Sequence, residues 1–368
     1  MSDTSVVVSV GGKPLPSNAL DSVQSVDVSE AMGAQTQVSV VVTARVSDRS
    51  DWTSPLDALV GPFAPFQVAI TRGQDELVVP ARATSAAWSL QAGALSSLTI
   101  AGLDASADLD REEHDKAWGG VSDANIATTL LGTICTPRVG TTPQPDGTDT
   151  FTPHQRATDW AYLKTLAARN DFDVYVTSEH GRLVGVFDRT DPLAAPQATL
   201  DLGYGALGGT ASVSVQLVSG QKVNVTHSAE GQSQQQVASN DGTGHKMGPI
   251  SLGGATTVLR DEHDLPGRLP PEQAAQVLAE SSAFGATLSV TISAPSMPLL
   301  RARRTVTVRG LGSMVSGLWL VKSVRHTISP AGHTQALSLT RNALGDGSSG
   351  AATGLGALAA AAGLSVSL

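Results

Sequence analysis

Alternation of apolar and polar residues along much of the chain is the feature that most restricts its fold. Apolar residues that recur at every second position lie on one face of an extended strand and do not form a helical stripe. Charged residues make up only 15% of the 368 residues, which argues against long solvated helices. The sequence therefore predicts a β-rich α+β protein built from antiparallel sheets. The alternating positions are Val6, Val8 and Val10; Val38, Val40 and Val42; Val68 and Ile70; Leu98 and Ile100; Val213, Val215 and Leu217; Val223 and Val225; Leu288, Val290 and Ile292; and Val306 and Val308.

The alternating runs fall into two groups with a different segment between them. Residues 1–100 and 201–344 are punctuated by glycine and proline, and we expect each to form an antiparallel β-barrel-like domain. Residues 101–200 hold two amphipathic stretches, which predict an α+β insertion of two helices and a hairpin. Residues 345–368 are rich in Gly and Ala and carry no charge after Asp346, so we expect a flexible tail or one that a partner orders.

Capping residues locate the two helices of the insertion. Ser122 is a suitable N-cap for a first helix, and Thr158 is suitable for a second. Residues 137–153 between them read as a Thr/Pro/Gly/Asp loop, and residues 172–187 read as a hairpin that turns at 178–181. A further short helix is expected after Pro270. The apolar faces of the three helices are Ile126, Leu130 and Ile134; Trp160, Leu163, Leu166 and Ala167; and Ala274, Val277 and Leu278.

Charge is unevenly distributed along the chain. The net charge of −9 argues against a general nucleic-acid binder, which needs a basic surface. Residues 281–345 contain no Asp or Glu and carry +7, so the rest of the chain carries −9 minus 7, or −16. Opposite charges suit contacts between copies or docking onto an acidic neighbour, and a solvated basic face is the alternative. The candidate partner-interface residues are Arg301, Arg303, Arg304, Arg309, Lys322 and Arg325.

Residue patterns for catalysis or metal binding are weak. The single cysteine, Cys135, excludes an intramolecular disulfide and a thiolate-rich zinc site, and we interpret it as a small buried residue at a helix end. His114 and His263 lie in near-copies of one charged motif, at 111–115 and 260–264, where carboxylates beside histidine could bind a divalent cation. We favour solvated surface for both motifs and predict no catalytic residues, no metal and no cofactor. The Gly203–Gly208 stretch fits a dinucleotide fingerprint as a string, but a strand-like segment follows it in place of a helix.

Three segments, in this order, resemble one known family. The first runs from Ala83 through Asp104 to the start of the helix after Ser122, and the second, residues 155–175, contains Trp160 and Leu163. The third is a predicted hairpin at residues 317–341 with Gly317, Trp319, His326, Gly332 and Arg341. Together they resemble the phage late control protein D family, the tail hub proteins that also form the front half of type VI valine-glycine repeat spikes. One departure is Leu300–Arg304, where that family commonly has a Pro-Gly turn.

The resemblance implies a non-enzymatic structural protein. It implies a trimeric ring that adapts the sixfold inner tube of a contractile phage tail or phage-like injection system to a threefold spike, beside other baseplate proteins. Two similar β domains repeated three times would match both symmetries. Since the sequence ends soon after the hub hairpin, a separate spike protein is expected. A metal-dependent cell-envelope hydrolase and a tail-tip protein of a non-contractile tail are the alternatives.

The expected location follows from the N-terminus and the hydropathy. Residues 1–5 lack the features of a signal peptide, and no apolar run reaches the roughly 18 residues of a membrane span. We expect assembly in the bacterial cytoplasm, no stable membrane insertion, and a final place in a virion or injection particle.

Overall fold

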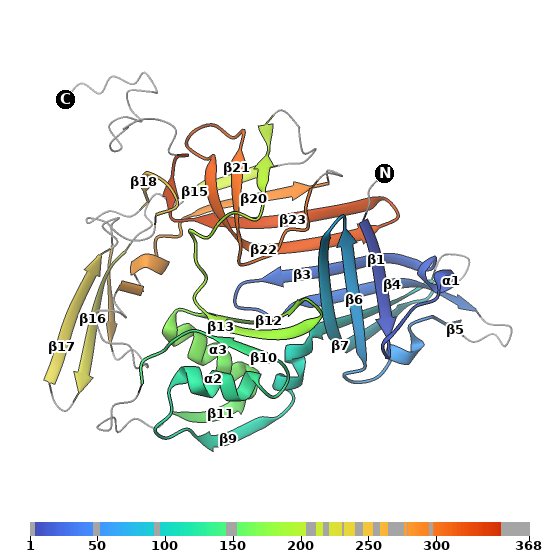
Figure 1. The fold of residues 1–368 in the computed structure, drawn as a ribbon, viewed down its shortest axis with the longest axis horizontal. Helices are drawn as coiled ribbons and strands as arrows, with labels where there is room; N and C mark the ends of the chain where they lie inside the picture. Colours follow the sequence, from blue (N-terminus) through green and yellow to red (C-terminus); the bar gives the residue numbers. More distant parts are fainter. Residues whose placement is uncertain are drawn as a thin grey trace. The chain divides into compact units, whose positions relative to one another are not determined.

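The computed structural model confirms the β-rich α+β class, with 53% strand and 15% helix (Figure 1). It describes residues 4–46, 52–91, 96–144, 153–203, 211–215, 221–229, 232–239, 246–252, 258–263, 276–277, 279–293 and 297–346, and of 221–229, 232–239 and 258–263 the backbone only. The predicted tail beyond Asp346 lies outside these residues. No helix within these ranges is long and apolar enough to cross a bilayer.

The chain divides into two compact units that are discontinuous in sequence. Unit 1 is Met1–Thr190, Thr291–Arg303 and Ser323–Ala336, and unit 2 is Asp191–Val290, Arg304–Lys322 and Leu337–Leu368. These bounds differ from the expected divisions near residues 100, 200 and 344, because two late segments return to the first unit.

The main sheet of unit 1 is antiparallel throughout. Residues 323–328 of β22 pair with β3, and the order continues through β4, β8, β7, β6, β1 and β2, with β5 beside β4. The strands are β1 (Thr4–Val10), β2 (Lys13–Pro14), β3 (Val23–Ala31), β4 (Gln37–Val46), β5 (Trp52–Thr53), β6 (Pro65–Arg72), β7 (Asp75–Ser89), β8 (Ser96–Asp104) and β22 (Gly317–Ser329), with short helices α1 (Ser17–Leu20), η1 (Asp57–Leu59) and η2 (Ala105–Asp110).

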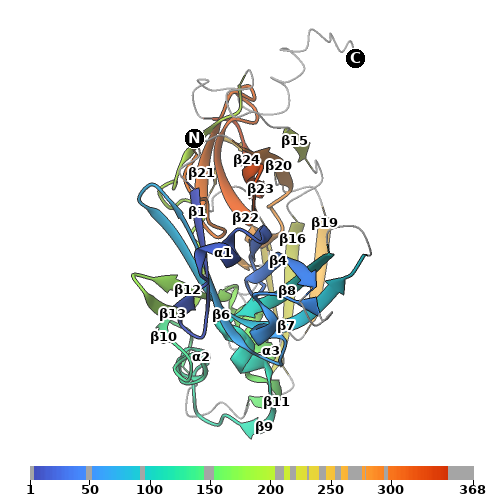
Figure 2. The same cartoon turned by 90° about the vertical axis from the view of Figure 1, so that its right-hand side faces the viewer.

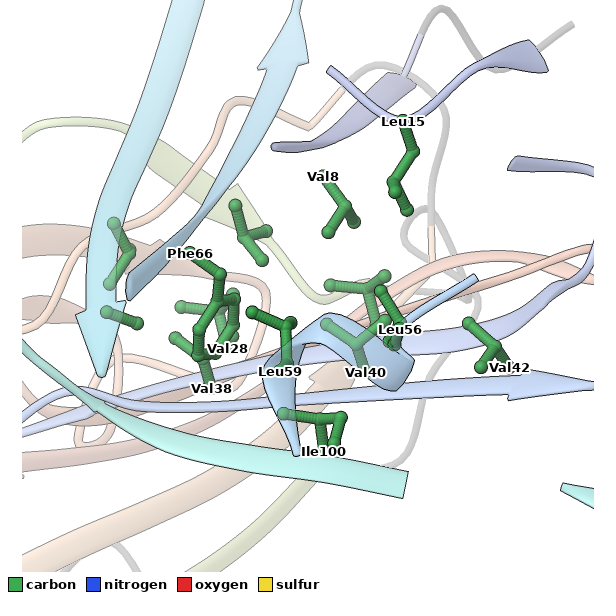
Figure 3. Close-up of a cluster of buried hydrophobic side chains, with 14 of the residues drawn as sticks. Val8, Leu15, Val28, Val38, Val40, Val42, Leu56, Leu59, Phe66 and Ile100 are labelled. Atoms are coloured by element: carbon green, nitrogen blue, oxygen red, sulfur yellow. The ribbon is translucent and has the colours of Figure 1, made fainter. Parts of the chain in front are cut away.

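The alternating residues supply the core of this sheet. Val8, Val40, Val68 and Ile100 are fully buried, and Figure 3 shows their neighbours converging from several strands and from η1. Burial of each such side chain contributes roughly 1.5–3 kcal/mol. The period-two pattern thus specifies which face of β1, β4, β6 and β8 is inside.

The α+β part of unit 1 lies between β8 and the end of the hairpin β12–β13. Helices α2 (Asp123–Leu131) and α3 (Asp159–Asn170) pack on a sheet of order β10–β13–β12, where β10 is parallel to β13 (Figure 2). The predicted caps are confirmed, since Ser122 Oγ accepts from the Asn125 amide and Thr158 Oγ1 accepts from the Ala161 amide. The strands are β9 (Glu113–Ala117), β10 (Thr136–Val139), β11 (His154–Thr158), β12 (Asp173–Glu179) and β13 (Arg182–Asp188).

One strand of this part, β10, differs from the sequence prediction, whereas the solvated surface expected for the charged motif at 111–115 is confirmed. The predicted loop at 137–153 overlaps β10, and the charged motif at 111–115 overlaps β9, which pairs with β11. Both strands are short, and β9 is exposed at every position, so neither shows an apolar alternation. Pairing partners, and not composition, hold them extended.

Unit 2 contains the alternating runs of the second half. Strand β20 pairs with β15, and β21 pairs with β14 on one side and β22 on the other. A further sheet has the order β17–β16–β19, and β18 pairs with β24. Residues 276–277 and 279–281 are helical, while the predicted start of that helix lies outside the described residues. The strands are β14 (Thr199–Asp201), β15 (Ala211–Val215), β16 (Gln221–Ala229), β17 (Gln232–Ser239), β18 (Ile250–Ser251), β19 (Val258–His263), β20 (Ala286–Ile292), β21 (Thr305–Arg309), β23 (Gly332–Arg341) and β24 (Ala343–Leu344).

Candidate assembly surface

Arg301 and Arg303 form buried ion pairs within unit 1. Arg301 binds both carboxylate oxygens of Glu30, with Nη2 at 2.7 Å from Oε1, and also donates to Thr177 Oγ1. Arg303 Nε lies 2.6 Å from Asp173 Oδ2. Both guanidinium charges are therefore neutralised inside the chain.

The surroundings of these pairs hold the turn after β3 against strand β12. Arg303 also donates to the carbonyls of Ala31 and Ala34 and stacks 4.2 Å from the ring centre of Tyr175, while Gly33 donates its amide to Asp173. Burial raises the pKa of Glu30, but the charge and hydrogen bonds of Arg301 outweigh it and the pKa lies below its usual value. Glu30 is therefore ionised inside the protein.

The other candidate basic residues lie at the surface. Arg304, Arg309 and Lys322 are exposed, and Arg325 is exposed beside Asp27, with its Nη2 at 2.9 Å from Oδ1. Contact with a partner stays a prediction, and these four residues are the ones placed to make it. Arg301 and Arg303 have an intramolecular role that sequence reasoning could not find.

The residues that carried the resemblance have structural roles. Asp104 is the N-cap of η2 and accepts from the amides of Thr36 and Ser106; burial raises its pKa against the opposing effect of these bonds. Trp160 and Leu163 lie in the core between α2, α3 and β12. Gly317 and Gly332 have φ of 123° and 129°, a region that favours glycine.

Arg341 is fully buried and donates hydrogen bonds to four carbonyl oxygens of unit 2. Its Nη1 donates to Val315 and Ser316 at 3.1 Å, and its Nη2 donates to Met247 at 3.0 Å and Gly345 at 2.9 Å. The guanidinium carbon lies 5.1 Å from the ring centre of Trp319, another of the matching residues. Desolvation lowers the pKa of Arg341 to about 10, with Asp346 opposing it, so the side chain stays charged at neutral pH.

Exposed apolar residues extend the core face of the main sheet of unit 1 at one end of its strands. Trp88 lies opposite the buried Leu98, and Trp52 lies opposite Val46 at the same end of β4 and β8. Directly opposite residues share one face, so Trp88 stands on the core face of the sheet. We call Trp52 and Trp88 the inner-face row; their exposures are 40% and 48%.

Large exposed apolar groups that extend a core face are typical of surfaces that another molecule covers. Sequence reasoning missed this row because β7 changes register between Ala83 and Ser85. Unbroken alternation from Leu77 places residues 85 and 87 inside, whereas the irregularity brings Ala86 and Trp88 to that face.

The two histidine motifs are not brought into a described metal site. His114 on β9 is 43% exposed, and its Nε2 lies 3.8 Å from Asp159 Oδ1. The side chain of His263 lies outside the described residues. Among the residues that the structure describes, no group of three or more His, Cys, Asp or Glu could hold a metal ion. Cys135 is half-buried, and burial raises the pKa of its thiol to about 11.

Comparison with known proteins shows the fold. No protein-family model matches the chain, and no curated protein matches it significantly in sequence. A tail protein from Neisseria meningitidis MC58 superposes with a TM-score of 0.64 at 14% identity, covering 92% of this chain and 97% of that one. The 43 kDa tail protein of prophage MuSo2 from Shewanella oneidensis gives 0.64 at 14% identity, covering 93% and 99%.

A third structure, a Francisella PdpA-VgrG complex, matches with a TM-score of 0.56 at 8% identity, covering 92% of this chain and 52% of that chain. Two tail proteins of nearly equal length and a chain of a VgrG complex thus share one architecture with this protein. The chain has the fold of phage tail proteins, as its resemblance to the tail hub family implied.

Proposed function

We propose that this protein is a non-enzymatic structural hub of the baseplate of a contractile phage tail or phage-like injection system. The observation that carries the proposal is the likeness in fold to two tail proteins along 92% and 93% of the chain. In this role three copies form a ring that adapts a sixfold inner tube to a threefold spike. Two β-rich units per copy supply six domains to the tube and one threefold axis to the spike.

The inner-face row is where a neighbouring copy would contact unit 1. Trp52 and Trp88 are large, rigid and exposed, and tryptophan contributes strongly to protein interfaces. Covering this face in a ring removes an apolar surface from water, which favours association. The exposed basic residues Arg304, Arg309, Lys322 and Arg325 are proposed contacts with acidic surfaces of the spike, the tube or other baseplate proteins.

Co-expression with the neighbouring tail genes tests this role. The hub proposal predicts that the chain copurifies with a tube protein and a separate spike protein, and that the complex weakens as salt is raised. The protein would assemble in the bacterial cytoplasm and end in a virion or injection particle. Copurification with tail-tip proteins and no sheath would favour the non-contractile alternative, and a lone monomer without tube or spike would contradict both.

A further inference from the structure

Two buried histidines link the hairpin β22–β23 to the first strands of the chain. Within unit 1, His326 on β22 is fully buried and His333 on β23 is 4% exposed. His326 Nδ1 lies 3.2 Å from His333 Nε2, and His326 Nε2 lies 3.0 Å from the carbonyl oxygen of Leu300. On the other side His333 Nδ1 lies 3.3 Å from Arg72 Nη1 and 3.5 Å from Thr4 Oγ1.

This chain of contacts closes the sheet on itself. Strands β1 and β6 lie at one end of the strand order of unit 1, while β22 and β23 lie at the other. The bonds from His333 to Thr4 on β1 and Arg72 on β6 therefore bridge the two ends. Around them, Gln335 accepts from the Leu300 amide and donates to the carbonyl of Pro298. The histidine pair thus lies at the seam of the barrel-like sheet.

The groups at the two ends of this series of contacts, Leu300 and Arg72, determine which ring nitrogens carry a hydrogen. The Leu300 carbonyl only accepts, so His326 Nε2 carries a hydrogen; Arg72 only donates, so His333 Nδ1 carries none. Neutral rings then leave His333 Nε2 to donate to His326 Nδ1, and the two ends agree on this one arrangement. An added proton on either ring would set two donors against each other, at His326 Nδ1 or at His333 Nδ1.

The charged groups around the pair do not stabilise a second proton on either histidine ring. Arg72 faces His333 from β6, and Arg301 approaches His326 from the segment before β21. Glu30 on β3 attracts a proton to His326, but Arg301 already pairs with that carboxylate. Burial accordingly lowers the pKa of both histidines to about 4, against the opposing effect of Glu30 on His326.

We propose that the His326–His333 pair is an acid-sensitive latch that keeps the seam of unit 1 closed at neutral pH and releases it in mild acid. The device belongs to the single chain and does not depend on the hub proposal. Release would free the hairpin segment 323–336 from β1 and β6, which changes the surface that unit 1 presents to any neighbour.

The sign of the effect follows from the direction of the shifts. A histidine whose pKa falls from 6.5 to about 4 on folding binds a proton in the unfolded chain first, so stability is lost as the pH falls from about 6.5 to about 4. Glu30 affects stability at lower pH. Its folded pKa lies below 4.5, so its contribution to stability is lost as the pH falls from about 4.5 through the folded pKa.

Calorimetric unfolding of the full chain in two buffers of different ionisation enthalpy tests the latch at pH 5.5. The wild type should take up about two more protons on unfolding than the double variant H326Q/H333Q, whose amides can donate and accept but do not titrate. Between pH 7.5 and 5.5 the unfolding constant of the wild type should rise about 100-fold more than that of the variant. His180→Asn, a change at an exposed turn position with φ of 50°, is the matched control and should behave as wild type.

Two further measurements keep the test decisive. Hydrogen exchange at pH 5 should show lost protection in residues 4–10 and 323–336 of the wild type. If the double variant does not fold, ring proton resonances of the wild type replace it, and the signals of two histidines should stay unshifted from pH 7.5 to 5.5. Equal proton uptake in wild type and variant, or titration of every histidine near 6.5, would overturn the proposal.

Discussion

At the scale of single residues, the same residue type serves two different purposes a few positions apart. Arg301 and Arg303 neutralise Glu30 and Asp173 in the interior, whereas Arg304 is exposed. The sequence shows a run of arginines without acidic residues nearby, and charge counting makes them equivalent. Their partners lie 271 and 130 positions away, so only the folded chain distinguishes them.

Charge reversal separates these roles. Arg301→Glu should lower the free energy of unfolding by at least 3–5 kcal/mol, because it leaves Glu30 buried beside a second negative charge. Arg304→Glu should change stability by less than about 0.5 kcal/mol and should weaken assembly more at low salt than at high salt. Urea denaturation and sedimentation at two salt concentrations measure both. If R301E is as stable as R304E, the buried pairs do not hold unit 1 as described.

Arg341 should be the most sensitive position of unit 2. Arg341→Met removes the donors of four carbonyl groups and should lower the free energy of unfolding by roughly 2–4 kcal/mol. Fluorescence of Trp319, which lies against the guanidinium, should shift in the folded variant. Arg309→Met, at an exposed position, is the control. Equal stability of the two variants would show that the four bonds contribute nothing.

At the scale of elements, features that depend on neighbouring residues could be predicted from the sequence, whereas the pairing of distant strands could not. The N-caps Ser122 and Thr158 depend on contacts three residues away, so they can be read from the sequence. The pairing of residues 323–328 with β3 joins segments about 300 positions apart, and no local pattern specifies it. Alternation correctly predicts which face of β7 points to the core up to Ala83. The irregularity after Ala83 reverses the two faces, so alternation does not predict that Trp88 lies on the core face.

The cap of α3 gives an element-scale prediction. Thr158→Ala should cost about 1 kcal/mol of stability, since the Ala161 amide loses its acceptor and Asp110 loses a donor. Thr165→Ala on the exposed face of the same helix keeps the cap and should not destabilise the protein. Thermal unfolding followed by circular dichroism compares the two. A Thr158→Ala protein as stable as Thr165→Ala would contradict the capping role.

At the scale of the whole molecule, the fold was predicted and the exposed apolar residues of the inner-face row were not. Composition and alternation indicate a β-rich chain, and three weak sequence segments indicate the fold that the solved tail proteins share. After residue 290 the chain nevertheless alternates between the two units, so the bounds of each unit could not be predicted from continuous runs of sequence. Exposure of the inner-face row likewise depends on which neighbours cover each strand.

Assembly should depend on the inner-face row. Trp88→Glu should leave the stability of the isolated chain nearly unchanged, because the side chain is already half exposed, and should reduce ring formation at least tenfold. Leu193→Glu changes an exposed apolar residue of unit 2 in the same way and serves as the control. Mass photometry over a concentration series measures both. Undiminished ring formation by W88E would place the interface elsewhere.

The rotational symmetry of the assembled protein is the most direct test of the hub account. We would purify the complex formed on co-expression with neighbouring tail genes and image it by electron microscopy. The account predicts a threefold ring of this chain between a sixfold tube and a pointed spike. A ring of another symmetry, or this chain at a position away from the junction of tube and spike, would contradict it.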